Sequence, residues 1–138
     1  MSVRAVFDAN VLIAALISPT GPGHRLLNAV RSGDIELVVC PSLFTEFHDV
    51  AYRPKIRAYI TEDEADRFIH DLIALAERRP DPASPPPVTR DPADDYLIAL
   101  AQSAEAVLVT GDHDLLDLHI DDLEIVSPRA FLDSIDQG

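Results

Sequence analysis

The sequence predicts an α/β protein, a three-layer α/β/α sandwich built around a central, mostly parallel sheet. Its predicted strands are short, continuous apolar runs, as expected for strands that are covered on both faces. They alternate along the chain with helical segments, which is the order that produces a parallel sheet. The length of 138 residues with 47% hydrophobic residues favours a single domain over residues 1–138 with a real core.

The first half of the chain contains two predicted strands and four predicted helices. Asn10 and Ser42 are candidate N-caps for two of these helices, and Gly33 is the predicted end of a third. Thr61 and Glu64 have the spacing of a capping box. The expected elements are strands at Val3–Phe7 and Ile35–Cys40 and helices at Val11–Ile17, His24–Arg31, 42–53 and 61–75.

A proline-rich stretch separates this half from the rest. Residues 80–87 could link two domains, but residues 88–138 are few for a second domain, so we interpret the stretch as a stiff, polyproline-like loop within one domain. The elements expected after it are a helix at Asp91–Ala104, a strand at Val107–Thr110, a helical turn at Leu115–Leu118, a strand at Leu123–Val126 and a helix at Pro128–Ile135.

The composition excludes several classes of protein. There is no run of 18 apolar residues, so no membrane span is expected, and the single cysteine, Cys40, cannot form an internal disulfide. This cysteine usage suits a reducing compartment and predicts a cytoplasmic protein. Disorder and coiled coil do not describe the chain as a whole.

The charge is strongly acidic, with 11 Lys and Arg against 24 Asp and Glu and a net charge of −13. Such a chain repels bare polyanions at long range, which argues against a duplex-DNA binder that depends on phosphate contacts. If it handles nucleic acid, it needs metal ions and a local basic patch. The only dense basic cluster is Arg53, Lys55 and Arg57, which is either an ordinary helix end or that patch.

The acidic residues follow the predicted strands. Asp8 ends the first strand and Asp112 follows a later one. Glu46 lies one turn into the helix after the second strand, and Asp94 lies near the start of the helix before Ala99. Because ligands of an open parallel sheet bind beyond the carboxyl ends of its strands, these acids should share one edge. Such a cluster needs hard divalent cations to relieve its repulsion, and Mg²⁺ or Mn²⁺ would suit phosphodiester hydrolysis. Histidine is absent from these positions, which argues against zinc.

Each residue also has a purely structural interpretation. Asp94 and Asp95 could favour a helix N-terminus, Asp112 could be an N-cap, and Glu46 could be a solvated helix residue. Asn10 could cap a helix or orient Asp8, and Thr110 could support a carboxylate or simply suit a strand. Cys40 is expected to be a small buried residue. The joint placement of the four acids favours a site.

Four segments in order resemble the motifs of PIN-domain ribonucleases. They are VFDANVLI at residues 6–13, PSLFTEF at 41–47, RDPADDYLIALA at 90–101 and VTGDHDLL at 109–116. Arg53-Pro54-Lys55 also resembles a branch of VapC-like toxins of type II toxin–antitoxin systems. The resemblance covers Val3 to about Phe131. Any one of the motifs is weak, but four in this order are specific.

The resemblance implies a PIN-like three-layer fold and Mg²⁺- or Mn²⁺-dependent cleavage of RNA. By position, Asp8, Glu46, Asp94 and Asp112 would be the catalytic, metal-binding quartet, with Asp94 favoured over Asp95 by counting back from Ala101. It also implies a homodimer and a cognate antitoxin protein. Asp91, Asp95 and Asp114 are accessory metal candidates, Asn10 and Thr110 are polar supports, and Arg53, Lys55 and Arg57 would contact RNA.

Two other functions fit the residues less well. A phosphoryl-aspartate protein also places an Asp after its first strand, but the phosphatase pattern needs another Asp where this chain has Asn10. A receiver domain needs a late Lys, and Lys55 is the only Lys of the chain. A non-catalytic binding or regulatory module would not need the complete quartet, and metal binding would separate it from a nuclease.

Overall fold

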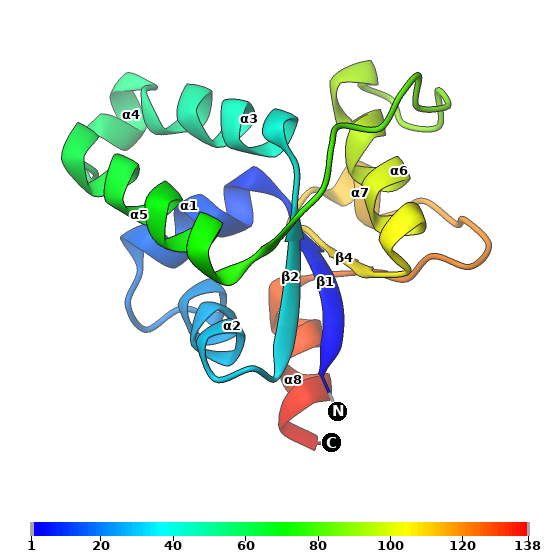
Figure 1. Cartoon of the computed structure of the whole chain (residues 1–138), viewed down its shortest axis with the longest axis horizontal. Helices are drawn as coiled ribbons and strands as arrows, with labels where there is room; N and C mark the ends of the chain where they lie inside the picture. The colour runs from blue at the N-terminus through cyan, green and yellow to red at the C-terminus, as the bar shows by residue number, and fades with distance from the viewer. Residues whose placement is uncertain (1, 138) are drawn as a thin grey trace.

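The computed structural model describes residues 2–137, which form a five-stranded parallel sheet flanked by helices (Figure 1). The strand order is β3-β2-β1-β4-β5, and every neighbouring pair is parallel, which confirms the predicted fold class. The central strand is β1. The strands are β1 (Val3–Phe7), β2 (Ile35–Val39), β3 (Glu77–Arg78), β4 (Val107–Val109) and β5 (Ile125–Val126).

Helices cover both faces of the sheet, as Figure 1 shows. α6 (Asp95–Ala104) packs against β1 and β4 on one face. The other face carries a layer in which α1 contacts α2 and α3, α3 contacts α5, and α2 contacts α8. The bounds of these helices are α1 (Ala9–Ile17), α2 (Pro22–Arg31), α3 (Pro41–Ala51), α5 (Glu62–Leu75) and α8 (Pro128–Gln137).

The central strands are apolar because both of their faces are buried. Ala5, Val6 and Phe7 of β1 are at most 1% exposed, and Leu37 and Val38 of β2 are equally enclosed. Burial of continuous apolar runs stabilises a parallel sheet and leaves polar residues to the strand ends. This explains why the site residues lie where the strands stop.

Two predicted helix caps are wrong. α1 begins at Ala9 and its N-cap is Asp8, whose carboxylate accepts a hydrogen bond from the backbone N–H of Asn10. α3 begins at Pro41, so Cys40 occupies the N-cap position that we assigned to Ser42. In both cases a single residue separates the strand from the helix, and this residue is the N-cap, two positions before the predicted one. The capping box of Thr61 and Glu64 is confirmed.

Two short elements were not predicted, and several boundaries differ. β3 consists of charged residues and pairs with β2, while α4 (Pro54–Arg57) is a single turn after α3. The helix expected from Asp91 is divided into a 3₁₀ turn at Pro92–Asp94 and α6. The late helical turn is α7 (His113–Leu116), and the last strand begins at Ile125 rather than Leu123.

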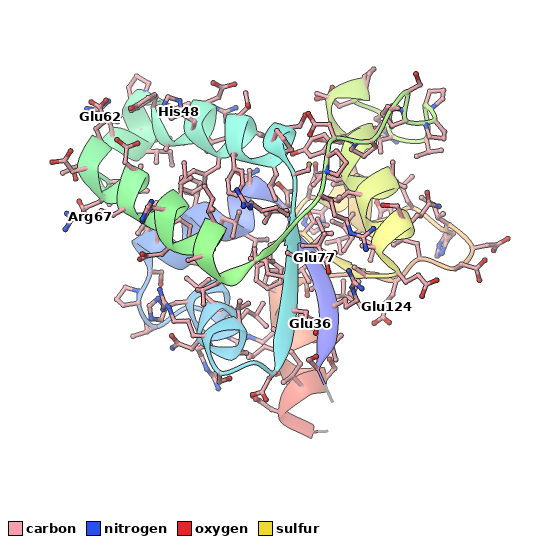
Figure 2. All side chains as sticks on the ribbon, in the orientation of Figure 1. Glu36, His48, Glu62, Arg67, Glu77 and Glu124 are labelled. Carbon is pink, nitrogen blue, oxygen red and sulfur yellow. The ribbon has the colours of Figure 1, made fainter. Side chains whose placement is uncertain are left out.

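Ion pairs explain why the charged strand β3 joins the sheet edge. Arg4 of β1 and Arg79 both donate to the carboxylate of Glu77, which is labelled in Figure 2. Arg79 also donates to the carbonyl of Ser103 at the end of α6, over 3.2 Å. These contacts place the start of the proline-rich loop, and the carboxylate of Asp81 then accepts a hydrogen bond from the N–H of Ser42 over 2.8 Å.

Among the described residues, no helix has both the length and the apolar character needed to cross a membrane.

Candidate active site

The carboxyl ends of β1 and β4 meet at Asp8. Its backbone N–H donates to the carbonyl of Val109 over 3.0 Å, and its side chain is only 4% exposed. One carboxylate oxygen accepts the N–H of Asn10 over 3.2 Å, and the other accepts the hydroxyl of Thr110 over 2.8 Å. Asp8 is therefore a helix cap and a buried acid at the strand end at the same time. Asn10 contributes its backbone N–H, and its side chain is exposed.

Thr110 connects Asp8 to the next acid. Its hydroxyl oxygen accepts a hydrogen bond from the backbone N–H of Asp112 over 3.1 Å, while its O–H donates to Asp8. The residue is fully buried. Asp112 caps α7, since its Oδ1 accepts the N–H of Asp114 over 2.9 Å. Asp112 can therefore be a helix cap and a site residue at the same time, because capping uses only one of its two carboxylate oxygens.

Glu46 comes from the middle of α3 and is half-buried. The phenol of Tyr96, in the first turn of α6, donates a hydrogen bond to its Oε2. This bond joins the helices of the two opposite layers across the end of the sheet. Tyr96 was not among the predicted site residues, because a single aromatic residue in an apolar helix is indistinguishable in the sequence from a core residue.

The adjacent acids Asp94 and Asp95 point to different surroundings. Asp95 is buried, and its Oδ1 accepts hydrogen bonds from the N–H groups of Val88 and Thr89 and from the Thr89 hydroxyl. These bonds lower the pKa of Asp95 and fasten the end of the proline-rich loop to α6. Asp94 makes no such contact and lines a pocket together with Glu46.

Electrostatic coupling shows which acids are neighbours. Burial, and then the charges of Glu46, Asp8, Asp91 and Asp112, raise the pKa of Asp94 to about 6. Burial also raises the pKa of Glu46, with Asp8 and Asp91 adding to the rise, while the hydrogen bond from Tyr96 and the charge of Arg53 oppose it. Acids from four segments therefore act on Asp94 and Glu46, whose charged forms are disfavoured in the absence of a cation.

The pocket at this place has a volume of about 420 Å³. It runs along α3 from Ser42 to Arg53 and is closed on the other side by Asp91, Ala93, Asp94 and Tyr96. Its acidic donors are all oxygens, with neither histidine nor cysteine among the lining residues, and this donor set fits Mg²⁺ or Mn²⁺ rather than zinc. Within residues 2–137, however, no three such side chains already stand close enough together to hold a metal ion.

Asp8 and Asp112 are not among the residues that line this pocket, and most of the remaining predicted residues lie outside it as well. Asp114 is exposed and forms a 3.7 Å ion pair with Arg90. Arg53 lines the pocket, whereas Lys55 and Arg57 lie further along, on the exposed turn α4. Cys40 is buried, as predicted, and its burial raises the pKa of its thiol to about 11.

Comparison with known proteins identifies a family model and a relative. The model described as "PIN domain" matches residues 4–114. The uncharacterized protein MJ1680 of Methanocaldococcus jannaschii is 26% identical over 148 residues, covering 99% of this chain and 94% of that protein.

Two solved structures have similar folds. PAE2754 from Pyrobaculum aerophilum superposes with a TM-score of 0.66 at 16% identity, over 99% of this chain and 91% of that one. A chain of VapBC2 from Rickettsia felis, solved bound to a DNA fragment from the promoter, gives a TM-score of 0.64 at 12% identity, over 91% of this chain and 98% of that one. At these identities the likeness is one of fold.

Proposed function

The chain belongs to the PIN domain family, and from this premise we propose that it is a Mg²⁺- or Mn²⁺-dependent endoribonuclease that hydrolyses RNA phosphodiester bonds. PIN domains are generally nucleases, which favours this function over a phosphoryl-aspartate protein or a non-catalytic module. The observation that carries the proposal is that acids from four segments meet at one end of the sheet: Thr110 hydrogen-bonds Asp8 and Asp112, and Glu46, Asp91 and Asp94 line one pocket. Nothing in the packing of the core requires acids from four segments to meet.

Asp8, Glu46, Asp94 and Asp112 are the residues proposed to hold the cation. When bound, the cation would supply activation of water and neutralisation of phosphate charge. Asp91 is the accessory acid favoured by the structure, because it raises the pKa of both Asp94 and Glu46. Asp95 and Asp114 have other partners, the loop at Thr89 and Arg90.

Three polar contacts would prepare these acids for their role. Thr110 holds one oxygen of Asp8, and the backbone N–H of Asn10 holds the other. Tyr96 holds Oε2 of Glu46, and Oε1 would then be the oxygen that binds the cation. Support of this kind orients carboxylate ligands and strengthens binding of a metal ion. Arg53, at the end of the same pocket, would bind a phosphate of the RNA.

The likeness to a VapBC2 chain supports a more specific role. We propose that the protein is the toxin of a toxin–antitoxin pair, that a cognate antitoxin protein binds it, and that it acts as a cytoplasmic homodimer. We call the pocket lined by Glu46, Asp91 and Asp94 the acidic pocket. An antitoxin that covers it would inhibit RNA cleavage.

Cleavage of a mixed RNA pool tests the proposed activity. We expect the purified protein to cut RNA in Mn²⁺ or Mg²⁺ and not in EDTA, and Asp8→Asn to lose the activity while remaining folded. The amide oxygen of Asn can accept the N–H of Asn10 and its NH2 group can donate to the Thr110 hydroxyl, so the fold should survive. Glu36→Gln, which removes an exposed acid from β2 (Figure 2), is the matched control and should cut normally. Absence of cutting by the folded wild type, or equal cutting by Asp8→Asn, would contradict the proposal.

A further inference from the structure

Three cations gather at the turn that follows α3, in a chain whose net charge is −13. Arg53 occupies the N-cap position of α4, and Lys55 and Arg57 lie within it, all three exposed. Among residues 2–137 these three form no ion pair, in contrast to four other arginines, namely Arg4, Arg25, Arg79 and Arg90. Their charges are therefore available to an anionic partner.

Aromatic side chains stand among these cations. Tyr59, directly after α4, is 69% exposed, whereas the other exposed large hydrophobic side chains of the described region reach at most 41%. The guanidinium of Arg57 lies 5.1 Å from the ring centroid of Tyr52, and His48 packs edge-on against the same ring. We call residues 52–59 the α4 corner. Cations interleaved with an open aromatic ring are the features that bind unpaired nucleotides.

The α4 corner continues into the acidic pocket through Arg53. This residue lines the pocket with Glu46 and Asp94, and its charge opposes the rise in the pKa of Glu46. At the rise of a helix, the seven residues from Arg53 to Tyr59 span roughly 9 Å. A strand of RNA bound along the corner would thus reach the pocket at its Arg53 end.

Acids border the corner on its other side. Glu62, labelled in Figure 2 at the start of α5, lies near the Tyr52 hydroxyl, and together with the charge of Asp66 it raises the pKa of that group. A polyanion would be repelled from this border. Lys55 and Tyr59 are both exposed and are four residues apart, the spacing at which side chains of a helical turn are neighbours.

We propose that the α4 corner is a binding surface for unpaired RNA nucleotides, in which Tyr59 stacks on a base while Lys55 and Arg57 bind phosphates and Arg53 leads the strand into the acidic pocket. The proposal rests on the proposed ribonuclease function and adds to it where the substrate binds outside the pocket and in which form. A base paired in a duplex offers no free face to Tyr59, so the surface should prefer single strands.

Fluorescence anisotropy tests this surface with a labelled 12-nucleotide RNA of mixed sequence, alone and as a duplex with its complement. The full-length protein would carry Asp8→Asn in every arm, so that the RNA stays intact in Mg²⁺. We expect Tyr59→Ala to weaken single-strand binding by about tenfold, as for other base–aromatic stacks, and Tyr59→Phe to bind normally. Lys55→Gln and Arg57→Gln should each lower the slope of log K against log salt by about 0.7.

Arg31→Gln is the charge control, since Arg31 is exposed at the end of α2 and lies outside the corner. Equal binding by Tyr59→Ala and Tyr59→Phe, an equal loss in Arg31→Gln, or duplex binding as tight as single-strand binding would overturn the proposal. So would an absence of RNA binding at low salt. A cleavage assay of the same corner variants with Asp8 intact separates the two proposals. If the wild type cuts RNA and Tyr59→Ala cuts it equally well, only the proposal for the α4 corner is contradicted. Failure of the wild type to cut contradicts only the ribonuclease.

Discussion

Asp94 and Asp95 are neighbours in the chain, yet they belong to two regions with opposite electrostatics. On the Asp94 side, burial and the charges of Glu46 and of the acids that follow β1 and β4 raise the pKa of the carboxyl group to about 6. On the Asp95 side, hydrogen bonds from Val88 and Thr89 surround the carboxylate and lower its pKa. The first region is unfavourable for a charge until a cation arrives, and the second is complete without one. Adjacent residues of one type can thus differ fully in role.

The largest difference between the two regions should appear in activity. Asp94→Asn should reduce RNA cleavage by more than about 100-fold, because it removes a proposed metal ligand, and should leave the fold intact or slightly more stable. Calorimetric titration with Mn²⁺ and a cleavage assay would measure this. Asp95→Asn is the matched control, and it should retain Mn²⁺ binding. If the two variants lost Mn²⁺ affinity equally, the assignment of separate roles would be wrong.

Stability should show the reverse order. Asp95→Ala leaves two backbone N–H groups and the Thr89 hydroxyl without their partner and should cost about 1–3 kcal/mol in the free energy of unfolding. Asp94→Ala should not lower this free energy in the absence of metal, and above about pH 6 it should raise it, because it removes a carboxylate that is disfavoured in the folded protein. Urea denaturation of both variants measures the contrast. A larger loss of stability for Asp94→Ala would mean that the contacts of Asp94 stabilise the start of α6 more than the hydrogen bonds between Asp95 and Val88 and Thr89 do.

The smallest expected effect is the dependence of stability on pH. Between its ordinary pKa of 3.8 and about 6, Asp94 keeps its proton in the folded protein and loses it in the unfolded chain. The stability of the metal-free protein should therefore fall as pH rises through this range. Asp95 acts in the opposite sense, because its lowered pKa gives stability that is lost as pH falls below its ordinary value.

Thermal melts of the wild type and Asp94→Asn from pH 4 to 7 in EDTA would resolve these slopes. The difference in Tm between Asp94→Asn and the wild type should increase towards pH 6 and then level off. Affinity for Mn²⁺ should rise over the same range, since the carboxyl group must lose its proton to bind a cation. A Tm difference that stays constant with pH would show that Asp94 titrates normally.

Much of the fold could be predicted from the sequence because burial on both faces leaves a strong apolar pattern. The runs at Val3–Phe7 and Ile35–Val39 are strands for this reason, and the parallel order followed from the alternation of strands and helices. β3 could not be predicted, since its charged residues pair through Glu77 with arginines 73 residues before it and two residues after it. Such a strand depends on tertiary contacts rather than on local pattern.

The candidate site was predictable to the same degree. The positions after β1 and β4 identified Asp8 and Asp112, but the sequence could not show that Asp95 anchors a loop. That role depends on Val88 and Thr89, which reach α6 only after the proline-rich stretch has turned back. Tyr96 was missed because its partner, Glu46, lies 50 residues away on a different layer. Metal binding by the quartet, like the single-domain assignment, stays a prediction.

The hydrogen bond from Thr110 to Asp8 spans 102 residues of sequence. During synthesis, at about 5–20 residues per second, the first acid of the site therefore leaves the ribosome several seconds before its partner. A nascent chain that has not yet reached β4 lacks the pairing of β1 with β4 and the acid Asp112 that follows it. If the site cleaves RNA, the protein is inactive while it is being synthesised. A factor that binds the emerging α3 would have time to bind before the site is assembled.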